Sequence, residues 1–150
     1  MDKYLIRKAD IKDLEAIFQV EQKAYPIPWS RENLKQCLIK DYLNFVMIIK
    51  GEVVGHMILQ AVCDEIQLLN LCVRPENQRT GLGNRWMNYL VETGRKLEAK
   101  SIFLEVRASN LSAQNLYQKY DFTQIGIRKS YYSASNNGRE DAVVMSLNLD

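Results

Sequence analysis

Residues 104–122, LEVRASNLSAQNLYQKYDF, contain two side chains that could exchange protons with a substrate. Glu105 lies inside an otherwise apolar run, SIFLEV, and burial would make its carboxylate a better general base. Tyr117 lies one predicted helix later and carries a phenol that could donate a proton. Spacing alone nevertheless favours structural roles, with Glu105 facing outward from a strand and Tyr117 packed in the core.

A second stretch that could bind a ligand is the loop Gln78–Gly83, which lies between an apolar run and a helical pattern. Gly81 and Gly83 stand where that helix would begin. A helix N-terminus presents unpaired N–H groups and about half a positive charge, and glycines let an anion approach the backbone closely. The natural ligand is a phosphate or pyrophosphate, to which Arg79 would add positive charge.

The common nucleotide-binding motifs do not fit this loop. A dinucleotide-binding fingerprint needs a third glycine where this chain has Trp86, and no G-x-x-x-x-G-K-[ST] string occurs. A simple turn before a helix explains Gly81 and Gly83 about as well as an anion site does.

The cysteines and the histidine do not form a metal-binding pattern. Cys37, Cys63 and Cys72 are widely spaced without a C-x-x-C pair, and His56 is the only histidine. A zinc site would need a fourth ligand from a carboxylate. We therefore predict no metal and three reduced thiols in a cytosolic protein.

The elements that would position these groups follow from hydrophobic periodicity and capping residues. Asp10 and Ser30 are predicted N-caps, and turns are expected at residues 50–52 and 136–138. The order is strand, two helices, three strands, helix, strand, helix and two strands. Strands are predicted over 4–9, 44–50, 53–62, 64–73, 101–106, 122–132 and 141–149, and helices over 11–25, after Ser30, over 82–97 and over 111–120.

Size and composition narrow the class of protein. The 150 residues, 47% of them hydrophobic, suit one domain over residues 1–150 with a substantial core. The net charge of +2 comes without a basic block, so we expect no direct nucleic-acid partner. Neither a signal peptide nor an apolar run of membrane-spanning length occurs, which predicts a soluble cytoplasmic protein without a membrane partner.

The loop and its surroundings resemble the Gcn5-related N-acetyltransferase (GNAT) family. Gln78, Gly81 and Gly83 match the pattern Q/R-x-x-G-x-G/A, the preceding strand LLNLCVRP ends at a proline-containing bend, and the element order agrees over the whole chain. The resemblance implies a mixed α/β fold, α+β-like, in a single GNAT-type domain. Its central twisted sheet would be mostly antiparallel, with about seven strands flanked by about four helices.

The resemblance also implies acetyl-coenzyme A as co-substrate. Its pyrophosphate would rest on the loop amides, and its pantetheine arm would bond to the preceding strand as an added strand does. The implied cofactor-binding residues are Leu71, Cys72, Val73, Arg79, Thr80, Gly81, Leu82, Gly83, Asn84 and Asn110.

Two further strings resemble the bacterial ribosomal-protein alanine N-acetyltransferases (RimI type). These are LEVRASN..A..LY...F and YY......GREDA..M, and EQKAYPIPWS resembles the substrate-side segment of the same group. In that group the glutamate matching Glu105 is the general base, acting through water, and the tyrosine matching Tyr117 is the general acid. The asparagine matching Asn110 contacts the cofactor, and Asn110 is also a natural N-cap.

The same resemblance implies N-terminal acetylation of small-subunit ribosomal protein number eighteen. A weak base suffices for that reaction, because an α-amino group has a pKa of about 7.7–8.0 against about 10.4 for lysine. Trp29, Tyr131 and Tyr132 would wall the peptide cleft, although packing explains each equally well. Arg107 and the cluster Arg139–Asp141 receive no catalytic part.

The sequence departs from the family pattern at two positions, and it leaves two other functions open. Asn84 replaces a frequent arginine, and Cys72 replaces a small aliphatic residue without an evident histidine or lysine to activate its thiol. Direct transfer without an acetyl-cysteine is therefore expected. The other functions are acetylation of a lysine side chain or small amine, and acyl-coenzyme A binding without catalysis.

Overall fold

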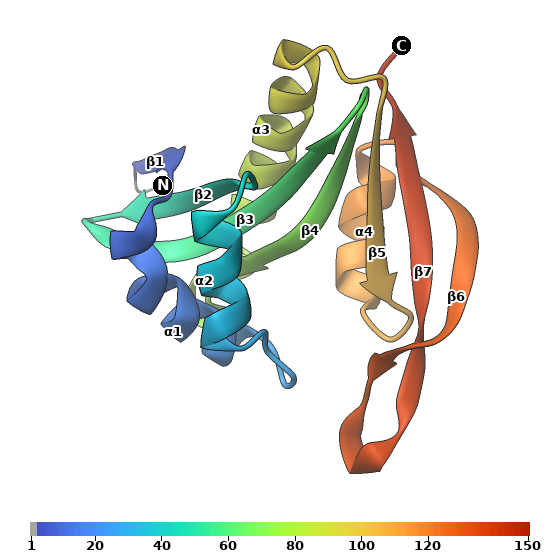
Figure 1. Ribbon diagram of the computed structural model, residues 1–150, viewed down its shortest axis with the longest axis horizontal. Coiled ribbons are helices and arrows are strands. Elements are labelled where there is room, and N and C mark those ends of the chain that lie inside the picture. The colour runs from blue at the N-terminus through green and yellow to red at the C-terminus, as the bar shows by residue number, and fades with distance from the viewer. Residues whose placement is uncertain (1–2) are drawn as a thin grey trace. The chain divides into compact units, whose positions relative to one another are not determined.

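The computed structural model describes residues 3–150 and contains the strands and α-helices in the predicted order (Figure 1). The strands form one seven-stranded sheet of order β1-β2-β3-β4-β5-β7-β6. Strands β4 and β5 run parallel, and the pairs β1–β2, β2–β3, β5–β7 and β6–β7 are antiparallel. This mixed, mostly antiparallel sheet with four helices confirms the predicted fold class. The elements are β1 (Tyr4–Lys8), α1 (Leu14–Ala24), α2 (Arg31–Ile39), β2 (Leu43–Ile49), β3 (Glu52–Val62), β4 (Glu65–Val73), α3 (Leu82–Lys96), β5 (Ser101–Arg107), α4 (Leu111–Lys119), β6 (Thr123–Ser133) and β7 (Arg139–Asn148).

The chain forms two compact units, each of which is described by itself. The first runs to Ala61 and includes Leu69–Gly83, and the second comprises Val62–Leu68 and Asn84–Asp150. The expectation of one domain over the whole chain stays a prediction. Among residues 3–150, no helix is long and apolar enough to cross a membrane.

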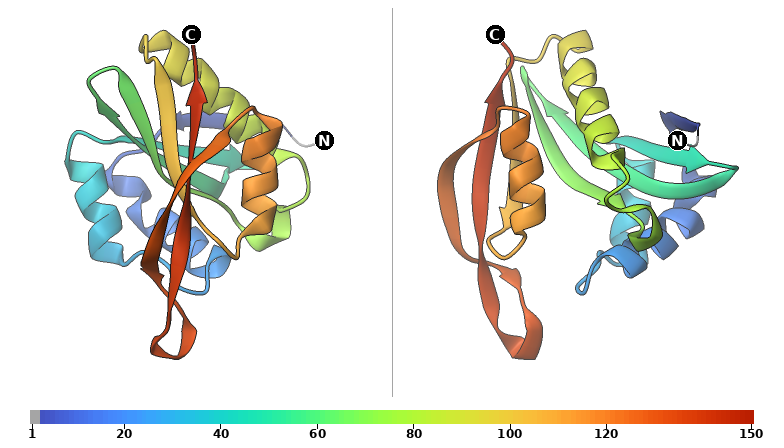
Figure 2. Two further views of the ribbon diagram at one scale, coloured as in Figure 1. Left: turned by 90° about the vertical axis from the view of Figure 1, so that its right-hand side faces the viewer. Right: turned by 180° about the vertical axis from the view of Figure 1, so that it is seen from behind.

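In the first unit, α1 and α2 lie side by side against β2 and β3 (Figures 1 and 2). Ser30 caps α2 as predicted by accepting from the Asn33 amide at 3.1 Å. Asp10 accepts from the Lys12 amide at 2.8 Å, but it caps a short 3-10 helix, Ile11–Asp13, that leads into α1, and not α1 itself. Capped helices can then turn an apolar stripe toward the sheet. The core cluster between these layers consists of Ile17, Leu34, Cys37, Val46 and Ile58.

In the second unit, α4 covers one face of β5 and β7 (Figure 2). The residues of β5 alternate between buried and partly exposed, as expected for a strand with one covered face. Helix α3 buries Trp86 and Leu90 completely. Its Gly94 allows a close approach to the sheet, because a Cβ atom there would lie 3.3 Å from Ile102 Cδ1 of β5 and 2.9 Å from Leu149 Cδ1 just after β7.

The second unit ends in the β6–β7 hairpin. The predicted turn is present, with Asn136 and Asn137 in the left-handed backbone region at φ 59° and 58°, which asparagine tolerates better than most residues. The pairing register shifts between Arg128 and Tyr132, so that β6 carries extra residues there. A bulge of this kind re-aims side chains at a strand's exposed face.

Candidate active site

The predicted anion loop, Gln78–Gly83, is held by its own polar groups in the first unit. Arg79 and Gly81 have φ values of 61° and 85°, which explains why a glycine stands at position 81. Thr80 Oγ1 donates to the Asn77 carbonyl at 2.5 Å, and Gln78 Nε2 donates to the Val73 carbonyl at 2.9 Å. The motif glutamine therefore ties the loop to the end of β4.

The geometry of β4 indicates which backbone groups face away from β3. The Arg74 amide donates to the Val54 carbonyl of β3 at 2.8 Å. Because N–H and C=O directions alternate along a strand, Cys72 also faces β3, whereas Leu71 and Val73 face the other way. The Tyr25 hydroxyl indeed donates to the Leu71 carbonyl. Of the three predicted pantetheine contacts, Leu71 and Val73 have the orientation that an added strand would need.

The two predicted asparagine contacts have structural partners in the second unit. Asn84 Oδ1 accepts from Lys119 Nζ and from the Tyr120 hydroxyl, each at 3.0 Å. This joins the start of α3 to the end of α4. Asn110 caps α4, because its Oδ1 accepts from the Ala113 amide at 3.1 Å. The capping role predicted for Asn110 is confirmed.

The proposed base, Glu105, is an ion-paired side chain of β5. Its Oε2 lies 2.6 Å from Arg128 Nε, and 29% of its side chain is exposed. The carboxylate is therefore neither isolated nor fully buried, and it lies on the partly exposed face of β5. The Oε2 atom itself has almost no contact with solvent.

Tyr132 interacts electrostatically with both Tyr117 and the Glu105 carboxylate. Burial and the nearby Tyr132 raise the pKa of Tyr117 well above its usual value. Burial and the Glu105 carboxylate raise the pKa of Tyr132 to about 12. Both phenols therefore keep their protons throughout the neutral range. Tyr117 also packs against Phe122, with ring centroids 5.9 Å apart, so the predicted core packing is present as well.

The aromatic residues predicted to line a peptide cleft differ in exposure. Tyr131 is 45% exposed and meets Tyr132 edge-on at a centroid distance of 5.0 Å. The guanidinium of Arg107 lies 4.5 Å from the centre of the Tyr132 ring. In the first unit, Trp29 packs against the core cluster and lines an open pocket with Asn33, Gln36, Cys37, Lys40, Tyr42 and Leu69.

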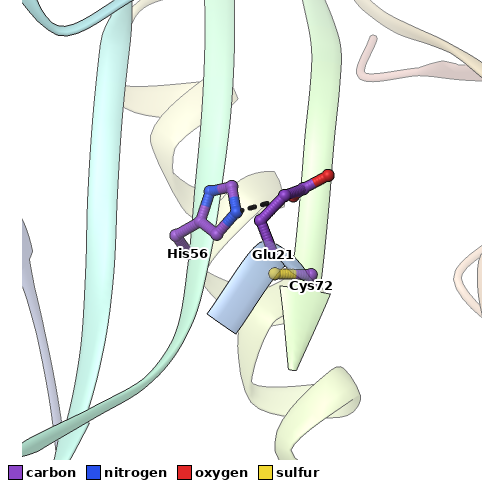
Figure 3. Close-up of side chains that lie close together, drawn as sticks. All are labelled: Glu21, His56 and Cys72. Carbon is purple, nitrogen blue, oxygen red and sulfur yellow. Dashed lines mark hydrogen bonds and ion pairs between the residues drawn. The ribbon is translucent and has the colours of Figure 1, made fainter. Parts of the chain in front are cut away.

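Sequence reasoning missed a buried carboxylate network around Glu21 (Figure 3). Glu21 is 1% exposed and accepts from His56 at 3.0 Å, from Asn70 at 2.9 Å and from the Trp29 amide at 2.9 Å. Burial raises the pKa of Glu21, but the hydrogen bonds and the charge of His56 outweigh it, and the net effect is a lowered pKa. Glu21 thus joins α1 to β3, to β4 and to the segment before α2.

This network brings His56 beside Cys72, contrary to the expectation that no histidine lies near that thiol (Figure 3). The candidate ligand atoms of Glu21, His56 and Cys72 lie within 4.8 Å of one another. Burial, together with the Glu21 charge, raises the pKa of the Cys72 thiol well above its usual value. A protonated thiol is a poor nucleophile and a poor metal ligand. The Glu21 carboxylate already accepts three hydrogen bonds. The expectation that the protein binds no metal stays a prediction.

Glu21→Ala should lower the free energy of unfolding by about 3–5 kcal/mol near pH 7, because its three partners lose their acceptor inside the protein. Urea denaturation measures this loss. Since the folded-state pKa of Glu21 is lowered, its stabilising effect is complete above the unfolded value of about 4.3 and fades as the pH falls further. The gap between wild type and variant should therefore narrow in acid.

Glu15→Ala is the matched control, because Glu15 lies on the same helix in an ion pair with Arg31 but is 57% exposed. An exposed pair contributes about 0–1 kcal/mol. Equal losses in the Glu15 and Glu21 variants, or a gap that widens in acid, would contradict the proposed buried network.

Comparison with known proteins connects these features to a chemistry. The acetyltransferase (GNAT) family pattern matches residues 14–122. The [ribosomal protein bS18]-alanine N-acetyltransferase of Escherichia coli K12 is 37% identical over 142 residues, 95% of each chain. Its counterpart from Haemophilus influenzae is 37% identical over 145 residues, which are 97% of this chain and 99% of the relative.

A solved structure shows the same relation in three dimensions. The crystal structure of the ribosomal-protein-S18-alanine N-acetyltransferase from Escherichia coli superposes with a TM-score of 0.92 at 36% identity. The alignment covers 99% of this chain and 95% of the other. Ard1 from Thermoplasma volcanium shares the fold, with a TM-score of 0.83 at 24% identity.

Proposed function

The chain belongs to the acetyltransferase (GNAT) family, and we propose that it transfers the acetyl group of acetyl-coenzyme A to the N-terminal alanine of ribosomal protein bS18. The observation that supports this substrate best is the 37% identity to bS18-alanine N-acetyltransferases over nearly the full length of both chains. The family match over residues 14–122 includes the loop, Glu105 and Tyr117.

Acetyl-coenzyme A fits the groups that the loop and the end of β4 offer. The left-handed residues Arg79 and Gly81 precede the start of α3, where N–H groups and a positive dipole end favour a diphosphate. Leu71 and Val73 have backbone groups facing away from β3, as an extended arm would need. The amides of Thr80, Leu82, Gly83 and Asn84 complete the proposed contacts, with Asn110 and Cys72 as lesser candidates from the resemblance.

In the proposed mechanism, Glu105 accepts the proton that the substrate amine must lose before its lone pair can attack the thioester carbon. Tyr117 donates its phenolic hydrogen toward the departing sulfur, because the phenol stays neutral at working pH. Trp29, Tyr131 and Tyr132 are proposed to contact the peptide. Transfer is direct, since the buried Cys72 thiol stays protonated.

A peptide that copies the N-terminus of bS18 tests this function. With acetyl-coenzyme A, we expect release of free thiol and an acetyl group on the α-amine, with a rate that rises toward about pH 8 as that amine loses its proton. A peptide with a blocked N-terminus and a free lysine is the control. Acetylation of the lysine peptide instead, or no thiol release between about pH 6 and pH 9, would discard the proposal.

A further inference from the structure

The segment Arg139–Asp141 binds the neighbouring strand in a way that gives the GREDA string a role. On β6, Arg128 pairs with Ala142 and Tyr132 pairs with Glu140. Three residues of β6, 129–131, therefore stand opposite the single residue Asp141. This bulge carries Tyr131 and leads directly into Tyr132.

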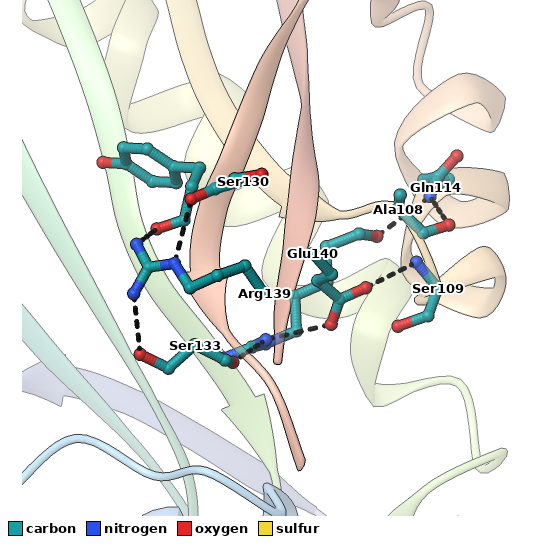
Figure 4. A network of polar contacts seen from close by, with 9 residues as sticks. Ala108, Ser109, Gln114, Ser130, Ser133, Arg139 and Glu140 are labelled. Carbon is teal, nitrogen blue, oxygen red and sulfur yellow. Dashed lines mark hydrogen bonds and ion pairs between the residues drawn. The ribbon is translucent and has the colours of Figure 1, made fainter. Parts of the chain in front are cut away.

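Arg139 holds the bulge through all parts of its guanidinium (Figure 4). Its Nε donates to the Ser130 carbonyl at 3.1 Å, and one terminal nitrogen donates to the Tyr131 carbonyl at 3.0 Å. The other terminal nitrogen donates to Ser133 Oγ at 3.2 Å. These carbonyls lie where the ladder with β7 is interrupted, so the side chain replaces strand pairing.

Asp141 completes the same arrangement from the other side of the bulge. Its Oδ1 accepts from the Ser130 amide at 2.8 Å, and Lys129 Nζ lies 3.8 Å from its Oδ2. Ser130 has a φ of 50°, a left-handed conformation that is unfavourable for serine and persists only where surrounding contacts enforce it. Arg139 and Asp141 are those contacts.

Between these two residues, Glu140 holds Arg107, whose guanidinium lies against the Tyr132 ring. Its Oε1 accepts from Arg107 at 2.9 Å, and its Oε2 accepts from the Ser109 amide at 3.2 Å (Figure 4). Arg107 in turn lies against the Tyr132 ring and donates to the Ser133 carbonyl at 2.7 Å. The tyrosine pair is therefore held both at its backbone and at one ring face.

We propose that Arg139 and Asp141 are positioning residues that preorganise the bulge, so that Tyr131 and Tyr132 present a fixed aromatic surface to the substrate peptide. This inference rests on the proposed function and deepens it, because it assigns a part in peptide recognition to residues whose side chains hold the bulge. A surface held in one arrangement binds more tightly than one that must first be ordered, and the apparent affinity falls with the fraction of molecules in the competent arrangement.

Steady-state kinetics with the bS18 peptide tests the role in recognition. If Arg139→Ala leaves the bulge in its native arrangement about a tenth of the time, the peptide KM rises about tenfold, while kcat and the KM for acetyl-coenzyme A change less than about twofold. Arg139→Lys should fall well short of wild type, because an ammonium cannot reproduce the three-way fork. Arg95→Ala, at an exposed arginine of α3, is the matched control and should leave all constants unchanged.

Amide hydrogen exchange over residues 128–133 reads the bulge without any substrate. We expect faster exchange there in Arg139→Ala, with unchanged exchange in β5. Unchanged exchange in the bulge would refute the positioning role, as would full recovery by Arg139→Lys. Faster exchange with an unchanged peptide KM would refute the role in recognition, while leaving the proposed function intact. A wild-type protein without activity on the peptide would instead contradict the proposed function, and the recognition role with it.

Discussion

Glu105→Gln should lower kcat for peptide acetylation by about 100-fold to 10,000-fold, the range that a positioned general base contributes. Glutamine keeps the size of the side chain and can still meet Arg128, but its amide cannot hold the proton that the amine releases. The affinity for acetyl-coenzyme A, measured by calorimetry, should stay within about twofold of wild type, because the loss falls on a step after binding.

The pH dependence separates a base from a merely structural carboxylate. An α-amine has a pKa of about 7.7–8.0, so an increasing share of the peptide arrives already neutral as the pH rises. The deficit of Glu105→Gln relative to wild type should therefore shrink above about pH 8. A deficit that stays constant with pH would contradict the role of a base.

Two further variants serve as controls for the role of Glu105 as a general base. Glu92→Gln changes an exposed glutamate of α3 and should leave the rate unchanged. Arg128→Gln breaks the 2.6 Å pair with Glu105 but keeps the carboxylate. If Arg128→Gln loses as much activity as Glu105→Gln, the ion pair and not proton transfer carries the effect.

The elements and the family could be predicted because local signals specify them. Asp10, Ser30 and Asn110 mark helix starts by their own side-chain chemistry, and each accepts the expected backbone hydrogen bond. The pattern of Gln78, Gly81 and Gly83 led to the GNAT resemblance, which the family match confirms, and with it the expectation of an acetyltransferase. Physically, the glutamine anchors the loop to Val73 and Gly81 adopts a positive φ.

The electrostatic setting of the site could not be predicted, because it depends on pairing register. Glu105 lies opposite Val144, and Arg128 lies opposite Ala142 on the far side of the same strand. Only the register of three strands brings the carboxylate and the guanidinium together, and one residue of slip would separate them. The bulge of β6 is a further shift that no local pattern in IGIRKSYY signals.

Glu21 is a different case, because the signal was present in the sequence. The residue follows Ile17 and Val20 at helical spacing, so it lies on the buried stripe of α1. A carboxylate on such a stripe must find hydrogen-bond donors inside the protein. His56 and Asn70, each in a predicted strand, were the available polar candidates.

Tyr117→Phe should lower kcat by about 100-fold to 1,000-fold, as removal of one donor to a developing anion typically does. Burial raises the pKa of this phenol well above its usual value, whereas a thiol ionises near 8.5. Complete proton transfer to a free thiolate is therefore uphill, and the phenol acts mainly as a hydrogen-bond donor to the sulfur as charge develops. This predicts that the variant keeps the shape of the wild-type pH profile, since Tyr117 does not titrate in the working range.

Phenylalanine preserves the ring that packs 5.9 Å from Phe122, so thermal unfolding should separate loss of chemistry from loss of fold. Tyr89→Phe, which removes a phenol from α3, is the matched control and should retain its kcat. Burst and single-turnover measurements should place the Tyr117→Phe defect in acetyl transfer and not in product release. A variant with wild-type kcat would assign Tyr117 to the core alone, and Tyr132, whose pKa of about 12 also keeps it protonated, would become the remaining phenolic donor beside Glu105.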